Sequence, residues 1–144
     1  MVSPQNLEGW GFSMAEHPHA EVMRRGWRAL SEGDTATLQQ LLTKDCVLHM
    51  PGNHSLAGEH KGLDAVLDTL RRMREETGGT LRWEAQHVLV DGRGHIVGVR
   101  RFTADRRGRH YDAIGASVCT LVGDRIASVE WFEADLDRFN EFWA

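Results

Sequence analysis

His49 is the residue whose type and setting best suit chemistry. It lies in an apolar run from Cys46 to Met50, where the alternation of an extended strand puts Val47 and His49 on one face. An imidazole is neutral near pH 7 and can both donate and accept a proton, so within an apolar hollow it suits general acid or base catalysis. The alternative is a hydrogen-bonded structural histidine at the end of a strand.

Three carboxylates, Glu130, Glu133 and Asp135, cluster near the end of the last long apolar run. An apolar pocket raises the pKa of a carboxyl group, which can then take a proton from a carbon beside a carbonyl or protonate a leaving oxygen. Asp135 also precedes Leu136, where it could simply cap a terminal helix. Both roles for Asp135 stay open.

Arg101 and Thr103 share one face of the run 96–104. In the interior, Arg101 would orient an anionic substrate group or a pocket carboxylate, because a buried guanidinium nearly always has a partner. The alternative places Arg101 on the solvated face, paired with Asp105 or Glu84.

Several residues are expected to form the wall of a substrate pocket. Trp83 alternates with Leu81 and Ala85 on one face, so it belongs to the core or the pocket wall, and His87 continues its parity. Tyr111, the only tyrosine, could offer a phenolic donor to a substrate oxygen. The expected substrate-contacting residues are Val47, Trp83, His87, Thr103, Tyr111 and Phe132.

Metal, nucleotide and nucleophilic chemistry lack their usual signatures. There is no His-Glu-x-x-His or paired-cysteine spacing, no glycine-rich phosphate cradle and no Gly-x-Ser-x-Gly elbow. His49, His87 and His110 come from three expected strands, and their convergence is left open. Cys46 and Cys119 lie in apolar runs typical of small buried residues. We therefore expect no bound metal and no cofactor.

The elements that must position these residues follow from hydrophobic periodicity. Pro18 suits a first helical turn, and apolar residues then recur with a helical period until Gly33. Asp34 is a good cap for a second, short helix. The other expected elements are a strand at 46–50, a helix at about 62–77, strands at 81–90, 96–104, 111–122 and 126–132, and a terminal helix or arm at about 136–143.

The four long strands are separated by turn-forming sequences at hairpin spacing, which predicts an antiparallel meander. Helices gathered before an antiparallel sheet define an α+β domain. We expect a cone-shaped α+β barrel, in which a curved antiparallel sheet wraps around helices and leaves a hollow on its concave side. Residues 1–15 are expected to form a tail, and residues 16–144 the single domain.

Composition narrows the partners and the setting. The chain has 144 residues, of which 41% are hydrophobic and 26% charged, and its net charge is −4. These values indicate an ordinary globular domain, and no basic run with interleaved aromatics favours nucleic acid. No stretch is long and apolar enough for a membrane span, and no signal peptide is recognisable. We expect a cytoplasmic protein without nucleic-acid or membrane partners.

Several short motifs, taken in order, carry a family resemblance. They are Val47-Leu48-His49-Met50-Pro51-Gly52, Ala57-Gly58, Gly62, Gly123-Asp124-Arg125-Ile126, Trp131-Phe132-Glu133-Ala134-Asp135 and Phe142-Trp143. Over residues 18–143 the chain resembles the cystatin-like α+β barrels of the nuclear transport factor 2-like superfamily. The resemblance is greatest to the branch of SnoaL-like polyketide cyclases and limonene epoxide hydrolases.

The resemblance implies a pocket but names no reaction, because the superfamily holds isomerases, dehydratases, cyclases, hydrolases and binding modules. It puts His49 at a pocket-facing polar position of the epoxide hydrolases, and it gives an acid near Glu133 and Asp135 a catalytic part. Where limonene epoxide hydrolases carry Arg-x-Asp, this sequence has Arg101 and Thr103. A hydroxyl cannot replace that carboxylate as a base, which counts against epoxide hydrolysis by that triad.

The sequence thus predicts a cofactor-free acid–base enzyme acting on a largely apolar polyketide-, terpenoid- or steroid-like molecule. His49 and Asp135 would transfer protons and Arg101 would position the substrate. The alternative is a non-catalytic module of the same fold that binds a small molecule or dimerises. A homodimer is expected from the habit of the family and because the outer sheet face would otherwise expose apolar residues such as Leu121 and Val129.

Overall fold

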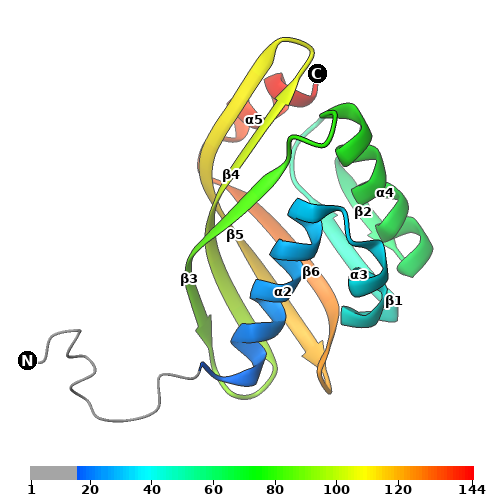
Figure 1. Cartoon of the computed structure of the whole chain (residues 1–144), viewed down its shortest axis with the longest axis vertical. Helices are drawn as coiled ribbons and strands as arrows, with labels where there is room; N and C mark the ends of the chain where they lie inside the picture. The colour runs from blue at the N-terminus through cyan, green and yellow to red at the C-terminus, as the bar shows by residue number, and fades with distance from the viewer. Residues whose placement is uncertain (1–15) are drawn as a thin grey trace, which may run out of the picture.

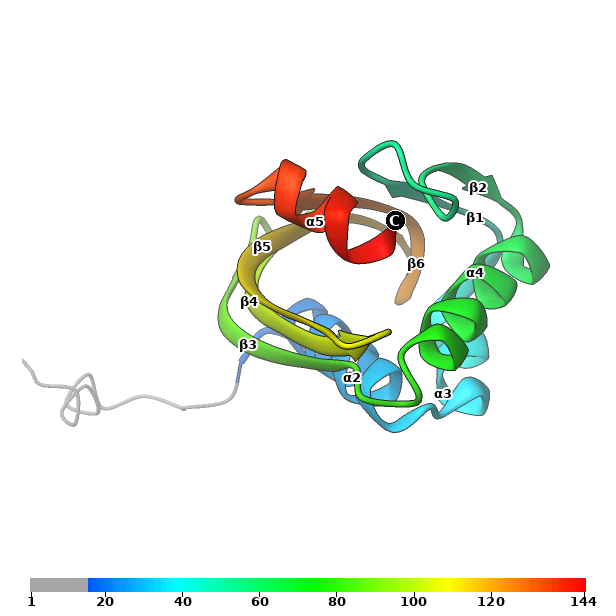
Figure 2. The same ribbon diagram turned by 90° about the horizontal axis from the view of Figure 1, so that it is seen from above.

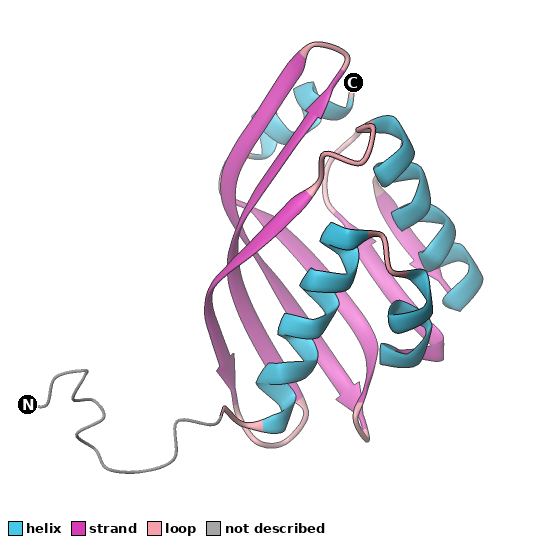
Figure 3. Cartoon of the chain, in the orientation of Figure 1, coloured by secondary structure: helices cyan, strands magenta, loops and turns pink. Residues whose placement is uncertain are grey.

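The computed structural model describes residues 16–144. Residues 1–15, the expected tail, lie outside the described residues, so the boundary at residue 16 stays a prediction. Figures 1 and 3 show the order of the elements. The helices are α2 (Pro18–Glu32), α3 (Thr35–Leu41), α4 (Leu63–Glu76) and α5 (Leu136–Trp143), and the strands are β1 (Leu42–Met50), β2 (Gly58–Lys61), β3 (Arg82–Val90), β4 (His95–Arg106), β5 (Arg109–Val122) and β6 (Arg125–Glu133).

The four predicted helices are confirmed. Pro18 lies in the first turn of α2, and Gly33 ends it with a φ of 71°, the left-handed conformation that glycine adopts without strain. The Asp34 carboxylate accepts the backbone N–H of Thr37 at 3.1 Å and so caps α3. The C-terminal segment is a helix rather than an extended arm, and it buries an aromatic face that includes Phe139.

The sheet has the strand order β2-β1-β6-β5-β4-β3. The predicted meander is confirmed, since β3 to β6 pair antiparallel with their neighbours. The expectation of a wholly antiparallel sheet needs correction, because β1 runs parallel to β6, with His49 opposite Glu130. Strand β2 is not among the expected elements, because Gly58–Lys61 is short and polar and has no apolar alternation.

The sheet curves around one side of the molecule, and α2, α3 and α4 close the other side (Figure 2). Helix α5 packs its aromatic residues into the same core at one end of the sheet (Figure 1). The structure is therefore the expected α+β barrel, with its core between the concave sheet face and the helices.

Two strand glycines allow the interior to fill closely. A side chain at Gly98 on β4 would collide with the indole of Trp27 from α2, and one at Gly115 on β5 would collide with the guanidinium of Arg100. Both glycines are inward positions where another side chain approaches the strand backbone. The second contact shapes the site described below.

The outer face of the sheet carries different apolar residues from those expected. Leu121 is 8% exposed and Val129 lines an interior cavity, so the prediction that these two face outward is wrong. The register between β5 and β6 shifts between Thr120 and Leu121, which the sequence pattern does not reveal. Large apolar residues that are exposed on strands are Leu89, Val97, Ile114, Val122 and Phe132.

Candidate functional site

His49 does not face the interior. Its side chain is on the outer face of β1, 47% exposed, with its Nε2 atom 2.9 Å from Glu59 on β2. Val47 shares that outer face and is only half-buried, while Leu48 and Met50 point inward. The predicted inward facing of Val47 and His49 is therefore wrong, because the apolar run fits either parity and the packing selects the other one.

Arg101 and Thr103 also lie on the outer face, of β4, so their predicted position in the pocket is wrong. Arg101 binds Asp112 of β5 through two hydrogen bonds of 2.8 and 2.5 Å. This pair lowers the pKa of Asp112 below its usual value, mainly through the hydrogen bond from Arg101. Arg101 therefore lies on the solvated face, as the alternative prediction had it, but its partner is Asp112 and not Asp105 or Glu84. Its neighbour Arg100 is the arginine that enters the interior.

Asp135 and Phe132 are outside the interior as well. The exposed Asp135 carboxylate accepts the backbone N–H of Arg138 at 3.1 Å and caps α5, so the capping role holds. Phe132 is 50% exposed on the outer face of β6. Their predicted places in the pocket are wrong, because Trp131 and Glu133 occupy the inward positions of β6.

The wall of the pocket is partly as predicted. Trp83 is buried and its ring lies 6.1 Å from that of Trp131, which places it in the interior. His87 is exposed, because a bulge in β3 shifts the register between Ala85 and His87 and turns the later residues over. The predicted parity of His87 with Trp83 is therefore wrong.

A buried polar network is the main chemical feature of the interior. Both oxygens of Glu133 accept hydrogen bonds: Oε1 from the Tyr111 hydroxyl at 2.5 Å, and Oε2 from the Trp131 indole and from Nη2 of Arg100, the latter at 2.7 Å. The side chains of Arg100 and Glu133 are fully buried. An ion pair shielded from water in this way stabilises a fold little, which directs attention to function.

The network follows from the strand register. Arg100 on β4 lies opposite Gly115 on β5, and Gly115 lies opposite Glu133 on β6. Because Gly115 has no side chain, the guanidinium crosses over β5 and reaches the carboxylate. Tyr111 lies on the same inward face of β5, four residues before Gly115. Burial first, and then the hydrogen bond to Glu133, raise the pKa of Tyr111 well above its usual value, so its hydroxyl stays protonated.

Arg100 keeps unused hydrogen-bonding capacity. Its Nε and Nη1 atoms are buried and have no hydrogen-bond partner among residues 16–144. The guanidinium carbon lies 5.4 Å from the ring centre of Trp131 and 5.8 Å from that of Phe102, so aromatic faces compensate part of the charge. Buried donors are normally satisfied, and these two remain available to an oxygen that enters the interior.

An apolar cavity of about 70 Å³ lies beside this network. Its wall contains the indoles of Trp27, Trp83 and Trp131, with Ser117 as its one hydroxyl-bearing residue. Ser117 lies next to the network on the inward face of β5: it is opposite Trp131, and Gly115, two residues earlier, is opposite Glu133. Trp131 therefore both lines the cavity and donates to Glu133, so it separates the two.

The described residues show no cluster suited to a metal ion. In the part of the chain from residue 16 onward, no three His, Cys, Asp or Glu side chains gather. His49, His87 and His110 are each exposed, and His110 pairs with Asp105 at 2.7 Å. None of the described helices is long and apolar enough to cross a membrane, and the cytoplasmic location stays a prediction.

The comparison with known families agrees with this architecture. The sequence model of the SnoaL-like domain family matches residues 23–129, which is most of the chain. This chain belongs to the SnoaL-like family. An uncharacterised protein of Mycobacterium tuberculosis is 32% identical to this SnoaL-like domain over 131 residues, covering 91% of this chain and all of the relative.

Two solved structures are similar over most of their length. Bal32a, from a soil-derived mobile gene cassette, is 35% identical, covers 88% of this SnoaL-like domain and 97% of its own chain, and has a TM-score of 0.85. A protein of unknown function with a cystatin-like fold from Xanthomonas campestris is 26% identical, with coverages of 88% and 98% and a TM-score of 0.82. These similarities confirm the predicted family and fold.

The sequence reasoning missed Arg100 and Trp131 as interior residues of this SnoaL-like domain. A signal was present for Arg100, which shares the parity of Phe102 and Ala104. Glu133, Tyr111 and Trp83 are the predicted site residues that the structure places in the interior.

Proposed function

We propose that the interior of this SnoaL-like domain binds a largely apolar small molecule and transfers a proton on it without a cofactor. The family includes polyketide cyclases, which makes such a reaction consistent with the fold. The observation that carries the proposal is the buried Glu133 carboxylate beside two unpaired N–H donors of Arg100. A base next to a preorganised donor for a developing oxyanion is the arrangement that enolisation requires.

In the proposed step, Glu133 takes a proton from a carbon next to a carbonyl. The electrons of that C–H bond form the enolate, and its oxygen is stabilised by a free N–H of Arg100, either at Nε or at Nη1. The proton then returns from Glu133 to another carbon. Alternatively, the enolate carbon attacks a second carbonyl and closes a ring, the C=O π bond of that carbonyl breaks, and its oxygen takes the proton from Glu133. Tyr111 keeps its proton and donates to Glu133, which holds the carboxylate in place. Glu133 thus takes the proton-transfer role that was predicted for His49 and Asp135.

Substrate binding must widen the interior. A cavity of about 70 Å³ is smaller than the several hundred Å³ typical of small-molecule sites. The indole of Trp131 lies between this cavity and Glu133, so its displacement is what would bring a bound carbonyl to the carboxylate and to Arg100.

A second candidate function is binding without catalysis. It is favoured by the three hydrogen bonds that already occupy Glu133 and by the tight apolar cavity. In that case the network fixes the position of β6 and the ligand stays unreacted.

Incorporation of deuterium from heavy water into 2-tetralone, an apolar ketone with acidic C–H bonds, tests the proposed step. We expect the wild-type chain to speed the exchange, and Glu133→Gln to lower the rate about 10²- to 10⁴-fold. His49→Ala and Asp135→Asn are matched controls outside the interior and should leave the rate unchanged. Binding of the ketone without faster exchange would favour the non-catalytic module, and equal exchange by wild type and Glu133→Gln would reject Glu133 as the base.

A further inference from the structure

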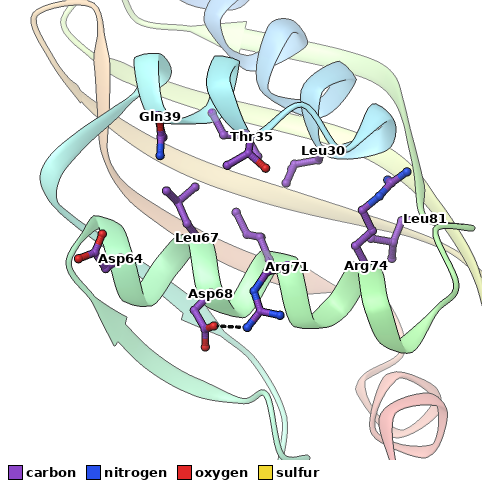
Figure 4. Close-up of a pocket in the computed structure, with 12 residues that line it drawn as sticks. Leu30, Thr35, Gln39, Asp64, Leu67, Asp68, Arg71, Arg74 and Leu81 are labelled. Atoms are coloured by element: carbon purple, nitrogen blue, oxygen red, sulfur yellow. Dashed lines mark hydrogen bonds and ion pairs between the residues drawn. The ribbon is translucent and has the colours of Figure 1, made fainter.

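An open groove of about 340 Å³ runs between α4 on one side and α3 with the end of α2 on the other (Figure 4). Its inner wall is formed by leucines, and its outer edge carries charged side chains of α4. Apolar floors with a few charged groups at the edge are typical of sites for small amphipathic molecules. The wall leucines are Leu30, Leu38, Leu67, Leu70 and Leu81.

The groove adjoins the interior cavity. Leu30, Leu38 and Leu70 line both spaces, so these side chains form the partition between them. Leu30 and Leu70 are only partly buried, and leucine side chains change rotamer readily at a surface. An apolar chain lying on the groove floor can therefore extend past them into the cavity.

The two ends of the groove differ in charge. Asp64 lies at one end and Arg74 at the other (Figure 4). Between them, Arg71 is neutralised by Asp68 at 2.5 Å and by Glu75 at 2.6 Å. Net positive charge is thus concentrated at the Arg74 end.

Arg74 has no carboxylate partner within 4.0 Å among the described residues. Its Nη1 donates to the backbone oxygen of Ser31 at 3.3 Å, and Arg82 donates to the same oxygen at 3.2 Å. These bonds hold both guanidinium groups at the C-terminal end of α2, where cations are favourable. A carbonyl carries no net charge, however, and neither Arg74 nor Arg82 has a carboxylate within 4.0 Å among residues 16–144.

We propose that this groove is the entrance to the interior and that it selects apolar carboxylic acids. Arg74, with Arg82 beside it, would bind the carboxylate, while the leucine floor takes the apolar body and directs it toward the cavity. Arginine suits this role because its planar fork matches a carboxylate. The inference rests on the proposed function only in requiring that the interior accept an apolar molecule.

Binding of decanoate and of 1-decanol tests the proposal, because the two probes share the alkyl chain and differ in charge. Tryptophan fluorescence reports on binding, since three indoles line the cavity. We expect Arg74→Gln to weaken decanoate about tenfold and to leave decanol unchanged. Arg71→Gln, on the same helix edge but already neutralised, is the matched control and should change either affinity less than about twofold. Added sodium chloride should weaken decanoate alone.

The entrance is tested separately by Leu70→Phe, which enlarges a partly buried partition residue. Stopped-flow mixing should show slower binding of both probes, and an unchanged rate would refute the entrance. Equal weakening of both probes by Arg74→Gln, or an equal effect of Arg71→Gln, would refute recognition of the carboxylate. Binding of decanol but not decanoate would overturn this inference and leave the proposed interior site intact. Failure of both probes would also overturn this inference, and failure of 2-tetralone to bind as well would overturn the proposed interior site.

Discussion

Replacement of Arg100 by methionine separates stability from chemistry at the buried ion pair. Methionine keeps much of the apolar stem but removes the charge, and the fully buried Glu133 carboxylate is left with Tyr111 and Trp131 as its donors. Removing one partner of a buried ion pair costs about 3 to 5 kcal/mol, because the other charge remains unpaired. At about 3 °C per kcal/mol for a domain of this size, we expect the Tm to fall by about 10 to 15 °C.

The double variant Arg100→Met/Glu133→Gln removes both charges of this pair, and the glutamine oxygen can still accept from Tyr111 or Trp131. We expect it to be about 2 to 3 kcal/mol more stable than the sum of the two single effects predicts. Unfolding in guanidinium chloride, followed by tryptophan fluorescence, measures all four proteins. A cost below about 1 kcal/mol for Arg100→Met, or strictly additive effects, would refute the reasoning that this pair is shielded from water. If the pair serves catalysis, the double variant should be folded but inactive in the deuterium exchange.

Two further predictions concern Tyr111 and the outer sheet face. Burial and the Glu133 hydrogen bond raise the pKa of Tyr111 above its usual 10.0, so the folded state keeps a proton that the unfolded chain loses. The resulting stabilisation is complete below about pH 10 and declines at higher pH. Phenolate absorbance of this single tyrosine should therefore appear only when the protein unfolds. Titration of Tyr111 near pH 10 in the folded protein would contradict this prediction. The homodimer stays a prediction, now placed at the exposed outer face around Phe132 and Ile114. Phe132→Glu should give a monomer in light scattering at micromolar concentration, whereas Val122→Glu, near the turn of the same hairpin, should not; a wild-type monomer would remove the prediction.

The element order was predictable because apolar residues recur with a helical period in the longer helices, aspartates cap α3 and α5, and turn sequences separate the meander strands. Which side chains of a strand point into the interior was not predictable, because both faces of some strands are apolar. In β4, Phe102 and Ala104 share the parity of Arg100, but Val97 and Val99 on the outward face share that of Arg101, so alternation favours Arg100 only weakly. The packing of Trp27 against Gly98 decides it, and that contact joins distant parts of the chain.

Register shifts account for other errors in the candidate site. The bulge after Ala85 reverses His87, and the shift near Thr120 brings Val129 inside, yet neither leaves a mark in the hydrophobic pattern. Glu133 was accessible to sequence reasoning because it belongs to a cluster of acids at the end of a strand. Its bonds from Arg100 and Tyr111 were not, because these donors lie on β4 and β5 and reach Glu133 only through tertiary register.

The bulge in β3 has a further effect on how the protein behaves in crowded solution. Because the barrel is not closed by hydrogen bonds, β3 and β2 are the two edges of the sheet, and each edge could recruit a strand from another molecule. The kink after Ala85 makes the β3 edge irregular, and polar side chains flank it. Strand β2 has only four residues, Gly58–Lys61, three of which are polar or charged. Both edges therefore resist strand addition and protect the protein against edge-to-edge aggregation.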